Sequence, residues 1–124
     1  MASMAPFEKD FLQLLGFVYL QNARPDKAAV VLAALDTLDP GQTRVMLALA
    51  LAQIRSNKPL RALQTLDQLA MAGGAGSAFH LLRAQALGAA DRGDEAATAM
   101  TTYLQLRAST PQPIAPTIQS PSAQ

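Results

Sequence analysis

The sequence contains no cysteine, no tryptophan and only one histidine among its 124 residues. Without cysteine the chain forms neither disulfides nor thiolate metal sites, and nothing points to an oxidising compartment. The single histidine, His80, has no partners spaced for a catalytic triad or a histidine-based metal site. The sequence therefore gives no support for an enzyme, a metal or a cofactor.

An excess of charge of one sign is also lacking. The sequence has ten Lys and Arg residues and nine Asp and Glu residues. No basic surface stands out, which argues against a nucleic-acid partner. The longest strongly apolar segment, residues 45–54, is about half as long as a membrane-spanning helix, so no membrane insertion is expected. The opening "MASMAPFEKDF" has no basic region followed by an apolar one, so no secretory signal peptide is expected. We therefore expect a soluble cytoplasmic protein.

What the sequence does contain is a segment that recurs at a fixed interval. Residues 24–40 read "RPDKAAVVLAALDTLDP" and residues 58–70 read "KPLRALQTLDQLA", with Pro25 and Pro59 at matching positions. The same step leads from Pro59 to Gly93, in a third copy that begins at "RGDEAATAM", residues 92–100. We call this step the repeat interval. Such self-similarity at a fixed period is typical of repeat architectures.

Small residues follow the repeat interval in pairs, with the same separation inside each pair. The pairs are Gly16 with Ala28, Ala50 with Ala62, and Ala84 with Ala96. Each pair lies in apolar runs with helical spacing; the first run, for example, is apolar at Phe11, Leu14, Leu15, Val18 and Tyr19. The simplest cause is a unit of two helices that touch closely where the small residues lie.

Six helices are expected from this periodicity and from the breaks between the runs. Pro25 and Pro59 suit the first turn of a helix, where the missing N–H costs nothing, and the Gly-rich "AGGAG" at residues 72–76 interrupts the chain. The expected helices are residues 7–21, 25–38, 42–56, 59–71, 77–90 and 94–107. Residues 1–6 and 108–124 are expected to be flexible, since the end of the chain is rich in Pro and carries no charge after Arg107.

This pattern resembles the tetratricopeptide repeat, a unit of about 34 residues that forms two antiparallel helices. The resemblance implies an all-α fold of three helical hairpins, residues 9–42, 43–76 and 77–110, stacked into a short right-handed superhelix within a domain of residues 7–107. The residues that match or replace the repeat pattern are Leu12, Leu15, Gly16, Tyr19, Ala28, Leu32, Leu35 and Pro40; then Met46, Leu49, Ala50, Gln53, Ala62, Leu66, Leu69 and Gly74; then His80, Arg83, Ala84, Leu87, Ala96, Met100, Tyr103 and Ala108.

The remaining polar features have structural explanations. His80 occupies a bulky position of the repeat, so a packing role is expected. The segment "AGGAG" has no preceding strand and no following Lys-Ser or Lys-Thr, so it is interpreted as a chain reversal and not as a phosphate site. Asp26, Asp94 and Glu95 fall in first helical turns, where they complement the helix dipole.

The candidate binding residues are those that face the concave side of such a repeat. Most are apolar, and together they predict a groove for an amphipathic helix or an extended segment, rimmed by two arginines. The alternative is that these side chains simply close the core of a short superhelix. The residues are Leu14, Phe17, Leu20 and Gln21; Arg44, Leu47, Ala48, Leu51, Ile54 and Arg55; and Leu81, Leu82 and Gln85.

Two longer segments, "FLQLLGFVYLQNARPDKAAVVLAALDTLDP" and "LLRAQALGAADRGDEAATAMTTYLQL", resemble a narrower family. They are similar to the tetratricopeptide chaperones of bacterial type III secretion, of the YscY type, over residues 7–107; the YscG-type needle chaperones share the architecture. The resemblance implies a chaperone in the bacterial cytoplasm that forms a heterodimer with a small early-secreted or needle-associated client, with an export-apparatus component as a further partner. The alternative is an adaptor that joins two folded proteins.

Overall fold

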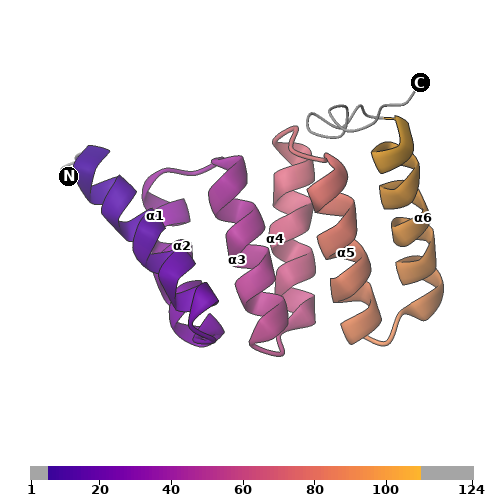
Figure 1. The fold of residues 1–124 in the computed structure, drawn as a ribbon, viewed down its shortest axis with the longest axis horizontal. Coiled ribbons are helices and arrows are strands. Elements are labelled where there is room, and N and C mark those ends of the chain that lie inside the picture. The colour runs from indigo at the N-terminus through magenta and orange to yellow at the C-terminus, as the bar shows by residue number, and fades with distance from the viewer. Residues whose placement is uncertain (1–5, 110–124) are drawn as a thin grey trace, which may run out of the picture.

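The computed structural model describes residues 6–109, and this part of the chain folds into six helices without a strand (Figure 1). Consecutive helices run in opposite directions and are joined by short connections. The prediction of an all-α fold of three helical hairpins is confirmed. Of the residues expected to be flexible, 1–6 and 108–124, residues 1–5 and 110–124 lie outside the described residues. The expectation is wrong for Pro6, which begins α1, and for Ala108 and Ser109, which continue α6. The helices are α1 (Pro6–Gln21), α2 (Pro25–Leu38), α3 (Thr43–Arg55), α4 (Pro59–Met71), α5 (Ser77–Ala89) and α6 (Gly93–Ser109).

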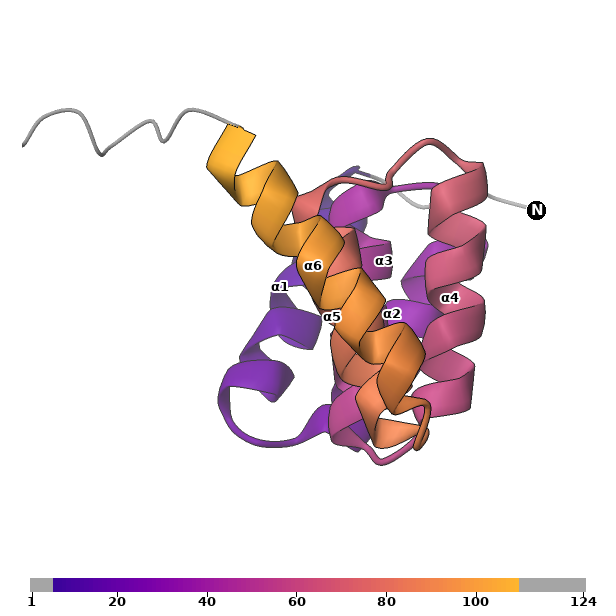
Figure 2. The ribbon, with the colours of Figure 1, turned by 90° about the vertical axis from the view of Figure 1, so that its right-hand side faces the viewer.

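The helices form two layers. Each helix packs against its neighbours in sequence, and α3 also contacts both α1 and α5. The first helices of the hairpins, α1, α3 and α5, therefore form one layer, while α2, α4 and α6 form the other; Figure 2 views this stack from its α6 end. A single hairpin could not bury its apolar face alone, and stacking three of them buries a continuous core.

The turn inside each hairpin is the same in all three units. Its central residue has a left-handed backbone, at Ala23 (φ 59°), Asn57 (φ 64°) and Asp91 (φ 66°), and these residues again follow the repeat interval. The next N–H closes the turn on a carbonyl earlier in the helix, a Schellman-type helix end. These bonds run from Arg24 to Tyr19 (2.8 Å), from Lys58 to Gln53 (2.9 Å) and from Arg92 to Leu87 (2.9 Å).

Of the six paired small residues, five are buried and Ala96 is half-buried. Ala28, Ala50 and Ala62 are fully buried. A Cβ atom added to Gly16 would lie only 2.6 Å from Cδ2 of Leu32, which is itself fully buried on α2. Glycine at this position therefore lets α1 and α2 approach more closely than alanine would allow.

In the second unit, a polar residue with a polar partner stands where the repeat pattern has an aromatic residue. Gln53 on α3 stands where the first unit has Tyr19, and it is buried. The hydroxyl of Thr65 on α4, also buried, donates a hydrogen bond of 2.7 Å to Oε1 of Gln53. The Thr65 hydroxyl also has the carbonyl oxygen of Arg61 as an acceptor, at 3.2 Å, so the buried amide oxygen of Gln53 depends on this contact more than the hydroxyl does.

Candidate protein-binding surface

The layer formed by α1, α3 and α5 carries a hollow between α1 and α3. Its volume is about 330 Å³, and most of its lining is apolar. Phe17, Leu20, Ala48 and Leu51 are half-buried, so the core covers these side chains only in part. The lining residues are Phe17, Leu20 and Gln21 from α1, and Ala48, Leu51 and Arg55 from α3.

A second hollow, of about 230 Å³, continues the first one along the same two helices. It is lined by Asp10, Gln13, Leu14, Phe17 and Arg44, so Phe17 belongs to both. We call the two together the α1–α3 groove. The groove has an apolar floor centred on Phe17, with Arg44 near one end and Arg55 near the other.

Arg44 contacts the floor directly. Its guanidinium carbon lies 5.6 Å from the centroid of the Phe17 ring, within the range of a cation–π interaction. The side chain of Arg44 is otherwise exposed. The groove can therefore offer an apolar surface and a positive charge to the same partner segment.

The predicted binding residues divide into three groups. Leu14, Phe17, Leu20, Arg44, Leu51 and Arg55 line the groove, together with Gln21 and Ala48. Leu47, Ile54 and Leu82 are partly buried and pack against the core cluster that includes Leu66 and Leu87. Leu81 is half-buried and Gln85 is exposed, and neither lines the two hollows.

Sequence reasoning missed an apolar face on the outer side of α1. Phe7 (78% exposed), Phe11 (55%), Leu14 (60%) and Val18 (37%) leave a stripe of large side chains uncovered. We call these four residues the outer stripe of α1. Their alternating steps of four and three along the chain place them on one helix face. The spacing was visible in the sequence, but it does not tell which face of α1 meets α2 and α3.

His80 lines a hollow of about 310 Å³ together with Arg83 and Glu95. His80 is half-buried, and its ring meets the edge of Phe79 with centroids 4.9 Å apart, which agrees with the predicted packing role. Among residues 6–109, no group of three or more His, Asp or Glu side chains is placed to hold a metal ion. No helix in that range is long and apolar enough to cross a membrane. The acids Asp26, Asp94 and Glu95 lie in first helical turns, as predicted.

Comparison with known proteins agrees with the helical repeat. Residues 19–86, from the end of α1 to α5, match the tetratricopeptide repeat family. No curated protein matches the chain significantly.

Proposed function

Because the chain belongs to the tetratricopeptide repeat family, whose members are non-enzymatic scaffolds that bind other proteins, we propose that it is a chaperone of a bacterial type III secretion system. It acts in the bacterial cytoplasm and holds a small early-secreted or needle-associated client in the α1–α3 groove. The two proteins form a heterodimer, and an export-apparatus component is a further partner.

The observation that carries this proposal is the continuity of uncovered apolar surface around α1. The α1–α3 groove lies on one side of this helix and the outer stripe on another, and Leu14 belongs to both. Large contiguous apolar surfaces on a soluble protein usually mark a protein interface. Covering each large side chain contributes roughly 1.5–3 kcal/mol, so a client that wraps α1 would be held firmly.

The charges at the groove indicate the chemistry of the client. Arg44 and Arg55 are exposed, and neither forms an ion pair within the described residues, while Asp10 lines the same hollow as Arg44. An amphipathic helix with large apolar residues on one face and acidic residues flanking them fits this arrangement. The similarity of two long segments to the chaperones of type III secretion is the second support for the proposal.

The alternative function is an adaptor that brings two folded proteins together without shielding a client. Such an adaptor does not need a large apolar surface on its first helix. A chaperone can be distinguished from an adaptor by its client, because the client of a chaperone is insoluble or degraded when expressed alone. The exposed outer stripe of α1 favours the chaperone.

The test is co-expression with tagged products of the neighbouring genes, followed by affinity purification. Phe17→Glu and Leu51→Glu place a carboxylate in the groove floor, and each should abolish recovery of the client while circular dichroism remains helical. Gln64→Glu, an exposed change on α4, is the matched control and should retain the client. Recovery of the client at wild-type yield by both groove variants would refute the groove as the binding site. Unfolding of both variants would show instead that these side chains belong to the core.

A further inference from the structure

The edge of the stack at which the three hairpin turns lie carries a basic residue in each unit. Arg24, Lys58 and Arg92 each directly precede the second helix of their hairpin and follow the repeat interval. A cation at a helix N-terminus is electrostatically unfavourable, because the helix dipole is positive there. Helix stability therefore does not explain why the same charge stands at this position three times.

The first two units add a second cation one turn further on. Lys27 follows Arg24 by one helical turn, and Arg61 follows Lys58 in the same way. In the third unit the corresponding residue is Glu95, and it pairs with Arg92 at 2.7 Å.

The four cations of the first two units, Arg24, Lys27, Lys58 and Arg61, have no ion-pair partner within the described residues. All four side chains are exposed. The basic character of this edge is thus confined to the first two units, and the third unit neutralises its own cation.

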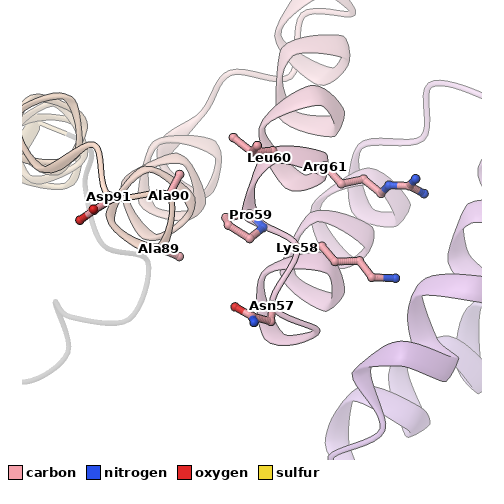
Figure 3. A pocket seen from close by; sticks show the side chains of 8 residues that line it. All are labelled: Asn57, Lys58, Pro59, Leu60, Arg61, Ala89, Ala90 and Asp91. Atoms are coloured by element: carbon pink, nitrogen blue, oxygen red, sulfur yellow. The ribbon is translucent and has the colours of Figure 1, made fainter.

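Two hollows lie along this edge, between successive units. The one between α4 and the α5–α6 turn has a volume of about 540 Å³ and is lined by Lys58, Pro59, Leu60, Arg61 and Asp91, among others (Figure 3). Figure 3 shows Lys58 and Arg61 both extending away from Ala89 and Ala90, toward the first unit.

The second hollow lies on that side of Lys58. Its volume is about 460 Å³, and it is lined by Asp26, Lys27, Val30, Val31 and Lys58, with Tyr19. Lys58 is therefore shared by both hollows. Each hollow also presents a large exposed apolar side chain, Val30 at 71% and Leu60 at 63% exposure.

We propose that this basic edge, defined by Lys27, Val30, Lys58, Leu60 and Arg61, binds an acidic segment of a second protein partner. One apolar side chain of the segment enters each hollow, against Val30 and Leu60. A carboxylate between them pairs with Lys58, and a neighbouring one pairs with Lys27 or Arg61. The charge complementarity sets the position of the segment, and the two apolar contacts hold it.

The surroundings favour an acidic peptide over a nucleic acid. Asp26 and Asp91 each line one of the hollows and would repel successive phosphates. The apolar contacts at Val30 and Leu60 would have no counterpart on a phosphate backbone. An acidic peptide needs its charge only near Lys58, where the cations gather.

This edge shares no residue with the α1–α3 groove, so the proposal does not depend on the identity or the binding of the client. A protein that holds one partner on α1 and α3 retains this edge for a second partner. In that case the two interactions can occur at the same time.

The experiment uses a fluorescein-labelled peptide with the core Leu-Glu-Asp-Leu, titrated with the full chain and followed by fluorescence anisotropy. The neutral peptide Leu-Gln-Asn-Leu and an oligothymidylate are the comparison probes. We expect the acidic peptide to bind more tightly than either of them, and its affinity to fall as salt is added, because exposed charges are screened.

Lys58→Glu and Arg61→Glu should each weaken acidic-peptide binding by about five- to tenfold, because an attraction becomes a repulsion. Arg107→Glu makes the same charge change in the last turn of α6, at the opposite end of that helix from the hairpin turn, and should leave the acidic-peptide affinity unchanged. Equal affinity for the neutral peptide, or an affinity that both Lys58→Glu and Arg61→Glu leave intact, would overturn the proposal. Oligothymidylate binding as tight as that of the acidic peptide would overturn it too, and would identify a general polyanion surface.

Discussion

The guanidinium carbon of Arg44 on α3 lies 5.6 Å from the centroid of the Phe17 ring on α1. The contact joins the first helices of two neighbouring units on the floor of the α1–α3 groove. It leaves the ring half-buried and the arginine exposed, so both groups remain available to a partner. Arg44 therefore has two roles: it packs against Phe17 on α1, and it presents a positive charge to a client.

Arg44→Ala is expected to weaken client binding more than it weakens the fold. An exposed cation–π contact contributes about 0.5–1 kcal/mol, so the melting temperature should fall only slightly. The association rate with an acidic amphipathic client should fall clearly, and this rate should depend less on the salt concentration than it does for the wild type. Surface plasmon resonance at several salt concentrations measures both effects. An association rate and salt dependence equal to those of the wild type would show that Arg44 does not face the client.

Gly16→Ala should destabilise the protein although alanine is the better helix former. The new methyl group would lie 2.6 Å from Cδ2 of the fully buried Leu32, and overpacking of this kind costs roughly 1–3 kcal/mol. Gly88→Ala is the matched control, because no atom lies within 4 Å of the corresponding methyl position on α5. There the higher helix propensity should raise stability by up to about 1 kcal/mol. Urea unfolding of the two variants compares them, and changes of the same sign would contradict the close approach of α1 and α2.

Thr65→Val alone should be more harmful than Thr65→Val combined with Gln53→Leu. Thr65→Val leaves the buried amide oxygen of Gln53 without its partner, at a cost of about 1–3 kcal/mol, whereas Gln53→Leu leaves the Thr65 hydroxyl with the Arg61 carbonyl as acceptor, at 3.2 Å. The double variant removes both polar groups and replaces them with apolar ones, so much of the loss should be recovered. A double-mutant cycle from chemical denaturation measures this coupling. Additive losses would show that the 2.7 Å hydrogen bond does not join the two side chains in solution.

Ala23→Asn should stabilise the first hairpin turn. Ala23 has a φ of 59°, a left-handed backbone that asparagine tolerates better than alanine. The second unit already has Asn57 at the equivalent position, with a φ of 64°. We expect a gain of about 0.5–1 kcal/mol for Ala23→Asn and a loss of similar size for Asn57→Ala. Thermal denaturation of both variants tests the equivalence of the turns, and a gain for Asn57→Ala would argue against it.

The sequence alone determined the number of helices, their approximate ends and their pairing into hairpins. These depend on local signals that are written in the chain, such as Pro25 and Pro59 at helix starts, the Gly-rich break near Gly74 and the repeat interval itself. Backbone conformation responds mainly to such neighbours in sequence. The largest difference at a helix end is that α6 continues past its predicted end at Arg107, to Ser109.

Only the tertiary structure decided which apolar side chains are covered. On α1, Leu14 and Leu15 are neighbours of the same residue type, yet Leu14 is 60% exposed and Leu15 is half-buried. On α3, Leu47 packs against the core while Leu51 lines the groove. Helical periodicity predicts an apolar face, but burial requires a neighbouring helix on that side. Within residues 6–109, α1 packs only against α2 and α3, and so its outer stripe stays exposed there.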